Sequence, residues 1–217
     1  MGKKIANFLL EKNHKIISIS RSELNFEYKN LIHLQKDITK LDTINDINKI
    51  LEKENIDNCI LNAGMYKNSF FHKMSYNDWH DVINLNILSI YNILHPVINQ
   101  MRKNKKGNII FTSSVVGNIG SMGASSYACS KSSINGLVKS LMLENSNKNL
   151  LINSISPGYI NEGMGCEIKS NLKKEIKKNI PLGKFGEVDE LNELIYYLIE
   201  KNKYITGTSI PINGGMY

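Results

Sequence analysis

Hydrophobic residues along the chain follow two kinds of pattern. Short apolar runs, rich in isoleucine and bounded by polar or turn-forming residues, are typical of β-strands buried on both faces. Longer segments in which apolar residues recur every three or four positions are typical of amphipathic helices. The strand pattern covers residues 15–20, 31–34, 58–62, 108–113, 150–156 and 208–212. The helix pattern covers residues 3–12, 39–54, 75–102, 126–147 and 187–201.

The alternation of these strands and helices predicts the fold class. A strand followed by a helix and another strand favours parallel pairing, with helices on both faces of the sheet. We therefore expect a Rossmann-like, doubly wound α/β fold that forms a single domain over residues 1–217. Proline and glycine concentrate at residues 156–165 and 179–186, and the polar segment between them is expected to lie over the carboxyl edge of the sheet as an insertion.

Composition narrows the classes of function. The chain has 217 residues, 41% of them hydrophobic, and no apolar run approaches the roughly 20 residues that span a bilayer, which predicts a soluble protein. Three widely spaced cysteines without a CxxC pair favour a reducing cytoplasm, and the histidines lack metal-ligand spacing. The net charge is +7, but the basic clusters at 101–107 and 172–178 lack interleaved aromatic residues. We interpret these clusters as solvated helix surfaces and expect no nucleic-acid, membrane or metal binding.

One pair of side chains in the predicted helix 126–147 has the chemistry of proton transfer. Tyr127 and Lys131 are four positions apart and therefore share one helix face. A nearby ammonium favours the phenolate form of a tyrosine, which moves its pKa from about 10 toward neutral pH. A Tyr and a Lys at this spacing are common in a lysine-rich chain, so a plain helix surface is the alternative for the pair alone.

Further motifs surround this pair in a fixed order. Ser114 follows the strand pattern 108–113 and lies thirteen residues before Tyr127. The other motifs are LNAG (61–64), Asn86 in the helix that follows, SPGYI (156–160) and YITGTSIPINGGMY (204–217). Together they resemble the short-chain dehydrogenase/reductase family over essentially the whole chain. The tail that starts at Ile180 looks most like the 3-oxoacyl-(acyl carrier protein) reductase branch of that family.

The resemblance implies roles for the catalytic residues. Tyr127 would protonate a carbonyl oxygen while a dihydronicotinamide supplies hydride to the carbon. Lys131 would lower the pKa of Tyr127 and hydrogen-bond the nicotinamide ribose, and Ser114 would donate a hydrogen bond to the carbonyl oxygen. Asn86 would hold, through its main-chain carbonyl, a water that links Lys131 to solvent, with a polar residue of a partly buried helix as the alternative. Ser113 is one residue out of register and is expected to be structural.

The expected cofactor depends on the end of the strand 15–20. Enzymes selective for NAD place an acidic residue there, whereas a basic residue suits the 2′-phosphate of NADP. This chain has Ser20 and Arg21, which favour NADP(H) over NAD(H), although a lone arginine after a strand is often only a surface residue. By the same resemblance Asp37 and Ile38 would flank the adenine. The remaining cofactor positions that it implies are Gly2, Asn62, Ala63, Gly64, Tyr127, Lys131, Pro157, Gly158 and Ile160.

The sequence departs from the family at two places. After PGYI the family commonly has a threonine that bonds the nicotinamide carboxamide, whereas this chain has Asn161 and Glu162. Glu162 could accept from the carboxamide or point into solvent. At the start, residues 1–10 match the helix after the glycine-rich phosphate loop, with Gly2 as its last glycine. The first strand and two earlier glycines are absent, which predicts a gap in the centre of the sheet and two unpaired strand edges.

These observations lead to one expected function and two alternatives. We expect an NADPH-dependent carbonyl reductase of the short-chain family in the cytoplasm, acting on a 3-oxoacyl thioester that is free or linked to acyl carrier protein. A reductase of a sugar or other small ketone is the first alternative. A truncated binding protein without catalysis is the second. The resemblance also implies a homodimer or homotetramer that associates through the helices 75–102 and 126–147.

Overall fold

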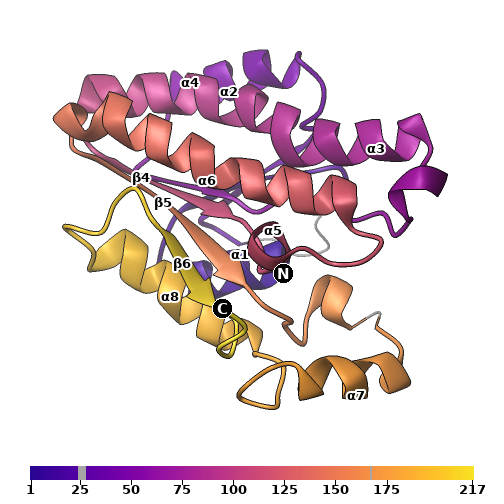
Figure 1. The fold of residues 1–217 in the computed structure, drawn as a ribbon. Coiled ribbons are helices and arrows are strands. Elements are labelled where there is room, and N and C mark those ends of the chain that lie inside the picture. Colours follow the sequence, from indigo (N-terminus) through magenta and orange to yellow (C-terminus); the bar gives the residue numbers. More distant parts are fainter. Residues whose placement is uncertain (24–27, 167) are drawn as a thin grey trace.

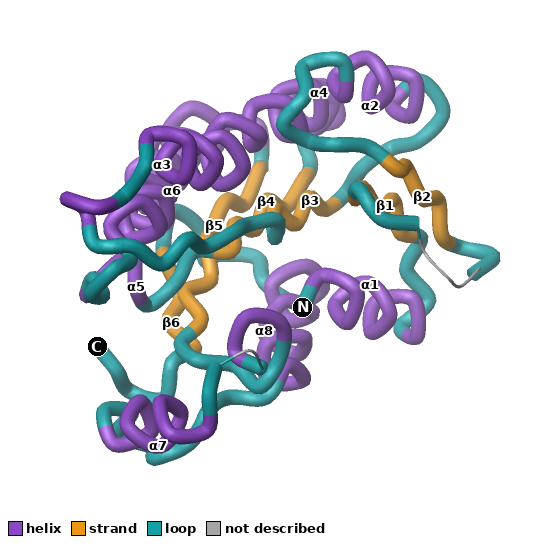
Figure 2. The backbone as a smooth tube through the Cα atoms, turned by 90° about the vertical axis from the view of Figure 1, so that its right-hand side faces the viewer, coloured by secondary structure: helices purple, strands orange, loops and turns teal. Residues whose placement is uncertain are grey.

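The computed structural model describes residues 1–23, 28–166 and 168–217. Within them, parallel strands lie between two layers of helices (Figures 1 and 2). The strands are β1 (Ile16–Ser20), β2 (Leu31–Gln35), β3 (Asn58–Leu61), β4 (Gly107–Thr112), β5 (Leu150–Pro157) and β6 (Ser209–Ile212). The α-helices are α1 (Gly2–Glu11), α2 (Thr43–Leu51), α3 (Tyr76–Ile83), α4 (Ser89–Asn104), α5 (Val116–Ile119), α6 (Ser125–Asn145), α7 (Ser170–Lys178) and α8 (Val188–Glu200). Shorter turns are the 3₁₀ turns η1 (Phe71–Lys73), η3 (Ser146–Lys148) and η4 (Gly163–Gly165) and the π turn η2 (Asn84–Leu88).

The two helix layers bury opposite faces of the strands. Helices α2, α3, α4 and α6 cover one face, and α1 and α8 cover the other (Figure 2). Along β4, Ile109 and Phe111 belong to the apolar cluster with α4 and α6, whereas Ile110 between them belongs to the cluster with α1 and α8. Side chains alternate between the faces of a strand, so a strand covered on both faces must be apolar throughout. This arrangement confirms the doubly wound α/β fold.

The strands form two separate sheets. β1 pairs with β2, and β3, β4, β5 and β6 pair in that order, all in parallel. Among the described residues no ladder joins β1 to β3. A cavity of about 760 Å³ lies between these two strands and is lined by residues of both. The predicted gap in the sheet, with two unpaired edges, is therefore present.

Each strand and long helix that the sequence pattern predicts is found, but some boundaries differ. The helix predicted over 39–54 begins only at Thr43, because Asp37 accepts hydrogen bonds from the backbone N–H and hydroxyl of Thr39 and holds a turn there. The helix predicted over 75–102 is interrupted by the π turn η2. Helix α7 lies in the predicted insertion, beyond the carboxyl ends of β5 and β6 (Figure 1).

Gln100 of α4 fastens the segment that leads from α2 into β3. Its amide nitrogen donates to the carbonyls of Leu51 at 3.0 Å and Glu54 at 2.8 Å. Its amide oxygen accepts from the backbone N–H of Ile56 at 2.9 Å. One side chain thus satisfies three backbone groups in a connection without regular structure, and this fixes where β3 begins.

We predict that Gln100→Leu lowers the free energy of unfolding by about 2–4 kcal/mol, because three partly buried backbone groups lose their partner. Urea denaturation followed by circular dichroism measures the loss. Asn99→Leu is the matched control, since Asn99 is exposed on the same helix and such a surface change alters stability by about 0.5 kcal/mol or less. Equal effects of the two substitutions would contradict the role of Gln100.

Candidate active site

The carboxyl end of β4 and the first turns of α6 bring Ser114 and Tyr127 together. After β4 the chain turns into α5, and the Ser114 hydroxyl accepts the backbone N–H of Val116 at 3.2 Å, which stabilises this turn. Tyr127 lies in the first turn of α6, so its ring faces the same edge of the sheet. Both side chains are buried. The two hydroxyl groups interact through a hydrogen bond that acts to lower the pKa of Tyr127.

Lys131 lies one helical turn after Tyr127 and is buried in the same cluster. Its ammonium donates to the main-chain carbonyl of Thr112, the last residue of β4, at 2.7 Å and lies 5.7 Å from the centroid of the Tyr127 ring. Ser113 donates its hydroxyl to the main-chain carbonyl of Lys131 at 2.9 Å. This bond ties α6 to β4, which is the structural part expected of Ser113.

Burial controls the pKa values of this pair. Removal from water raises the pKa of Tyr127, with the Ser114 interaction acting in the opposite direction. The pKa of Tyr127 is raised overall, because desolvation of the phenol outweighs the hydrogen bond with Ser114, and the lowering contribution expected from Lys131 stays a prediction. Burial also lowers the pKa of Lys131 to about 8. At neutral pH the phenol is protonated and can donate its proton, and the lysine carries a positive charge beside it.

Asn86 sits in the π turn η2, between the LNAG turn and α6. Its side-chain oxygen accepts from the N–H of Met65 at 2.8 Å, and its amide nitrogen donates to the carbonyl of Met65 at 3.0 Å and to the hydroxyl of Ser130 at 2.9 Å. The amide is thus fully engaged with protein partners. π turns interrupt helices and are frequent at functional sites. The water-holding role of the Asn86 main chain stays a prediction.

The Asn62-Ala63-Gly64 turn at the end of β3 passes close to this cluster. A Cβ atom on Gly64 would lie 3.3 Å from the Lys131 ammonium nitrogen and 3.4 Å from the Asn86 side-chain oxygen, so the absence of a side chain permits the close approach. Asn62 accepts from the Thr112 hydroxyl at 3.4 Å. A Cβ on Gly2 would lie 3.0 Å from the Asn62 amide nitrogen. The start of α1, the LNAG turn and Lys131 therefore lie side by side.

The residues predicted to bind adenosine lie at the ends of β1 and β2. Arg21 is exposed, and its guanidinium forms no ion pair with another described residue. Ser20 donates to the carbonyl of Ser22 at 2.9 Å. Hydrogen bonds from Thr39 lower the pKa of Asp37, with the backbone bond the larger cause. These bonds hold the Asp37 carboxylate in one orientation. Its contact with an adenine ring stays a prediction.

The segment after β5 forms the opposite side of the site. The carbonyl of Pro157 accepts the N–H of Val115 at 2.8 Å, and the N–H of Gly158 donates to the carbonyl of Ile212 at 3.0 Å. Ile160 is buried and forms a parallel β-bridge with Gly186. These contacts attach the segment firmly to β4 and β6.

Glu162 forms an ion pair within the protein, and its acceptance from the nicotinamide carboxamide stays a prediction. Its carboxylate forms an ion pair with the ammonium of Lys4 in α1 at 3.1 Å. The hydrogen bond from Lys4 is the largest cause of a lowered pKa of Glu162. The neighbouring Asn161 donates its side-chain amide to Glu187 at 2.6 Å. Both residues therefore hold the segment after β5 in place, against α1 and against the start of α8.

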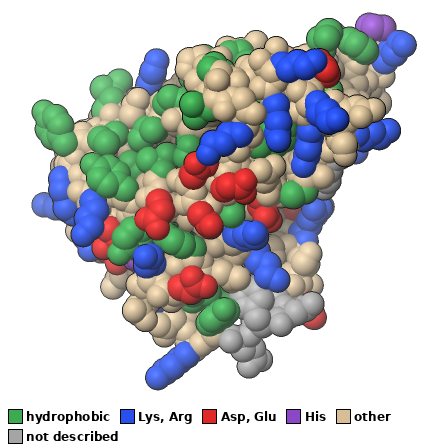
Figure 3. Space-filling view, turned by 90° about the horizontal axis from the view of Figure 1, so that it is seen from below, with side chains coloured by type: hydrophobic (Ala, Val, Ile, Leu, Met, Phe, Trp, Pro, Cys, Tyr) green, Lys and Arg blue, Asp and Glu red, His purple; other side chains and the backbone are tan. Residues whose placement is uncertain are grey.

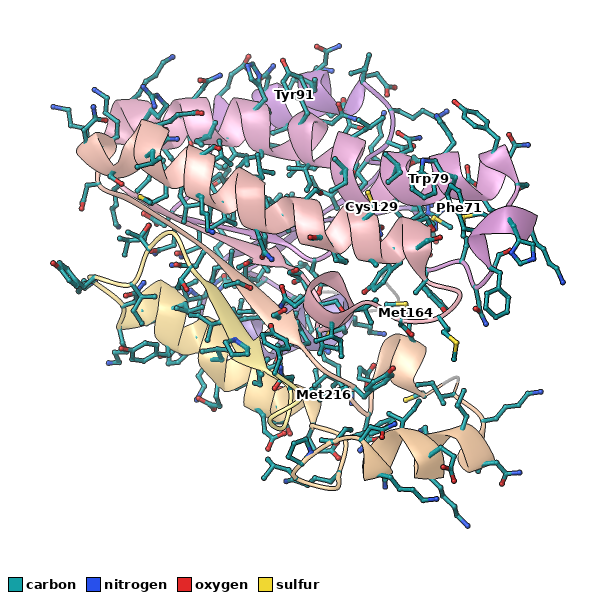
Figure 4. The ribbon with its side chains drawn as sticks, viewed as in Figure 1. Phe71, Trp79, Tyr91, Cys129, Met164 and Met216 are labelled. Atoms are coloured by element: carbon teal, nitrogen blue, oxygen red, sulfur yellow. The ribbon has the colours of Figure 1, made fainter. Side chains whose placement is uncertain are left out.

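The ring of Tyr66 completes the site, and the sequence motifs do not single it out. It contacts the Tyr127 ring edge-on, with centroids 5.5 Å apart and an interplanar angle of 85°. Its position two residues after the LNAG turn is the signal that could have identified it. Figure 4 shows Phe71 and Trp79 near α3 and Met164 at η4.

The arrangement fits a nicotinamide dinucleotide along the carboxyl edge. Two observations support this fit. Gly64 has no side chain, which lets another group come close to the backbone there, and one cavity is lined by Gly2, Ser20, Asn62 and Lys131 from both parts of the site. Lys131 of the catalytic cluster lines that cavity, and so does Ser20, which precedes Arg21 in the sequence. Within the described part of the chain, no group of acidic, histidine or cysteine side chains could hold a metal ion.

We predict a pH-dependent stability that arises from Lys131. An unfolded lysine binds more protons than this buried one between pH 8 and 10, so stability should rise with pH in that window by about 2 kcal/mol. Below pH 8 the lysine is protonated in both the folded and the unfolded state, so it no longer makes the stability depend on pH. Chemical denaturation of the wild type and Lys131→Met across pH 7–10 measures the difference. Lys139→Met, at an exposed position of α6, should leave the rise intact. If Lys131→Met also shows the rise in stability between pH 8 and 10, the buried lysine is not the source of that rise.

The helices carry no sign of a membrane segment: within the described residues each is too short or too polar to cross a bilayer. Comparison with known proteins agrees with the geometry of the site. A family model described as Enoyl-(Acyl carrier protein) reductase matches residues 2–217. A solved structure of a short chain dehydrogenase family protein from Francisella tularensis has a TM-score of 0.89 at 26% identity, and the match covers 99% of this chain and 93% of that one.

Two relatives are both named 3-oxoacyl-[acyl-carrier-protein] reductase. The protein of Chlamydia trachomatis is 39% identical over 170 residues, which cover 78% of this chain and 68% of the relative. The protein of Buchnera aphidicola is 32% identical over 228 aligned positions, which cover 100% of this chain and 93% of the relative. The chain therefore belongs to the short-chain dehydrogenase/reductase family of oxidoreductases, in the branch similar to 3-oxoacyl-(acyl carrier protein) reductases.

Proposed function

We propose that the protein reduces 3-oxoacyl thioesters with NADPH. The observation that carries this proposal is the buried cluster of Ser114, Tyr127 and Lys131 at the carboxyl edge of the sheet. Similar proteins named 3-oxoacyl-[acyl-carrier-protein] reductase and acetoacetyl-CoA reductase support the choice of substrate. Bound NADPH would supply the hydride for the carbonyl carbon.

The side chains of the cluster perform the proton chemistry. Ser114 donates a hydrogen bond to the carbonyl oxygen and stabilises the negative charge that develops there. Tyr127, protonated at neutral pH because burial raises its pKa, transfers its proton to that oxygen. The positive charge of Lys131, 5.7 Å from the tyrosine ring, stabilises the phenolate that remains. The product is a hydroxyl group, and a solvent proton restores the phenol.

Charge and surface features support the proposed partners. Arg21 is exposed at the end of β1, where it can bind a 2′-phosphate. Figure 3 shows acidic side chains gathered near the centre of the lower face. An acidic carrier protein would be repelled there, so we propose that it approaches on the side of the molecule that carries Phe71 and Met164. The net charge of the whole chain is +7, which attracts an acidic partner.

Exposed apolar residues on the outer helices support a homodimer or homotetramer. Leu88 and Tyr91 near the start of α4 are 54% and 57% exposed, and Leu143 of α6 is 76% exposed. Figure 4 shows Tyr91 on the outer side of the helix layer. Covering such side chains is favourable, since burial of apolar area drives association. We accordingly propose a single-domain enzyme of the cytoplasm that associates through α4 and α6.

We predict that the purified chain oxidises NADPH in the presence of an acetoacetyl thioester, and that Tyr127→Phe lowers the turnover number by at least about 100-fold while NADPH binding is kept. Loss of absorbance at the NADPH band measures turnover, and intrinsic cofactor fluorescence measures binding. Tyr204→Phe, at a side chain that is 96% exposed, is the control and should be unaffected. Turnover only with sugars or small ketones would refute the substrate. Saturable binding without any turnover would refute the reaction.

We further predict that Arg21→Ala raises the KM for NADPH at least about tenfold and leaves the KM for NADH nearly unchanged, because a charged hydrogen bond to the 2′-phosphate is lost. Steady-state kinetics with both cofactors give the ratio. Lys203→Ala is the matched control, since this exposed lysine precedes β6 and lies toward the opposite edge of the sheet. An equal rise for NADH would show that Arg21 does not read the phosphate.

A further inference from the structure

We propose that Tyr66 is a positioning residue for Tyr127: its ring holds the Tyr127 ring in one orientation and keeps water from the Tyr127 hydroxyl. Tyr66 lies in the loop after β3 and acts through Tyr127 rather than on the substrate. Its effect on turnover rests on the proposed function, whereas its effect on the Tyr127 phenol exists without substrate or cofactor.

The loop that carries Tyr66 is attached at its first residue by Asn86. The Asn86 side-chain oxygen accepts the N–H of Met65 at 2.8 Å, and its amide nitrogen donates to the carbonyl of Met65 at 3.0 Å. Both backbone groups of Met65 are thus bound to one buried side chain. The backbone immediately before Tyr66 therefore has a fixed position.

The same loop is attached again at Ser69, next to the segment that leads into α6. Ser69 donates its N–H to the carbonyl of Gly123 at 3.0 Å. Gly123 has a φ of 72°, and a Cβ atom there would collide with the Asn68 side-chain oxygen, so glycine permits this contact. Residues 65–69 are therefore attached at both ends, with Tyr66 between the attachment points.

The Asn86 amide also connects this loop to the helix that carries Tyr127. It donates to the hydroxyl of Ser130 at 2.9 Å, and that hydroxyl donates to the carbonyl of Tyr127 at 2.8 Å. Asn86 and Ser130 are both buried, so water does not compete for these bonds. One side chain thus fixes the loop of Tyr66 relative to the backbone of Tyr127.

The Tyr66 ring contacts the Tyr127 ring edge-on. The ring centroids are 5.5 Å apart with an interplanar angle of 85°, which is a preferred arrangement of two aromatic side chains. Rotation of the Tyr127 ring would break this contact. Tyr66 therefore favours the orientation in which the Tyr127 hydroxyl meets Ser114.

Tyr66 also covers part of the Tyr127 side chain. Tyr66 is 39% exposed and Tyr127 is 8% exposed, so loss of the Tyr66 ring would open the Tyr127 phenol to water. The titratable groups around Tyr127 are Lys131 on the same helix and Tyr66, and Tyr159 after β5 interacts with Tyr66. Burial is the largest cause of the raised pKa of Tyr127 and Tyr66 acts in the same direction, so removal of Tyr66 should lower this pKa.

The test compares the wild type with Tyr66→Ala. Tyrosines labelled with carbon-13 at Cζ report their ionisation by NMR between pH 7 and 11, and Tyr127→Phe identifies the Tyr127 signal. We expect Tyr127 to titrate at lower pH in Tyr66→Ala than in the wild type. With NADPH and an acetoacetyl thioester, kcat should fall at least about fivefold while KM changes by less than about twofold.

Two further variants separate the ring from its hydroxyl and from general effects. Tyr66→Phe keeps the ring and should restore most of kcat and of the wild-type titration. Tyr204→Ala removes a ring that is 96% exposed and should change neither quantity. Thermal melting followed by circular dichroism checks that each variant unfolds cooperatively.

Three results would overturn the proposal. They are an unchanged Tyr127 titration in Tyr66→Ala, a loss of turnover that Tyr66→Phe does not restore, and a rise in KM with kcat unchanged, which would make Tyr66 a substrate contact. A wild type that oxidises no NADPH would instead contradict the proposed function. The NMR titration would then still decide the role of Tyr66, because it needs neither substrate nor cofactor.

Discussion

The site is organised around a buried ammonium group. Lys131 is removed from water and must be solvated by protein groups, since an unpaired buried charge is strongly unfavourable. The carbonyl of Thr112 supplies that partner at the end of β4, where no further strand residue needs it. Ser113 then fixes the Lys131 backbone, and Gly64 leaves the room that the ammonium occupies. These requirements fix α6 against the sheet and place Tyr127 beside Ser114.

The same burial sets the protonation of the two reacting groups. It raises the pKa of Tyr127 and lowers that of Lys131 to about 8, so the two values move apart and both groups keep their protons at neutral pH. In the proposed reaction, proton transfer from the phenol would leave a phenolate beside a cation, which is a better stabilised pair than either group alone in an apolar setting. An exposed pair with the same spacing would lack this coupling, because water screens both charges.

The sequence predicted most of this arrangement but not all of its physics. The strands and long helices followed from runs such as 108–113 that are apolar on both faces. Ser114, Tyr127 and Lys131 followed from ordered motifs. The direction of the Tyr127 pKa shift did not follow, because burial depends on what covers α6. Tyr66 and the Glu162 ion pair with Lys4 were also missed, since both are long-range contacts of loop residues with no local pattern.

The gap in the sheet separates two parts of the site that are held in place in different ways. The catalytic cluster lies on the continuous sheet of β3 to β6, whereas Arg21 lies on the β1–β2 pair across the gap. That pair is joined to the rest through α1, which packs on α8 with Phe8 edge-on to Tyr196 at 6.1 Å and with Lys4 bound to Glu162. Side-chain contacts of this kind hold position less rigidly than a ladder of backbone hydrogen bonds. The proposed proton chemistry therefore lies on the continuous sheet, whereas Arg21, the proposed phosphate-binding residue, lies on the strand pair that such side-chain contacts hold in place.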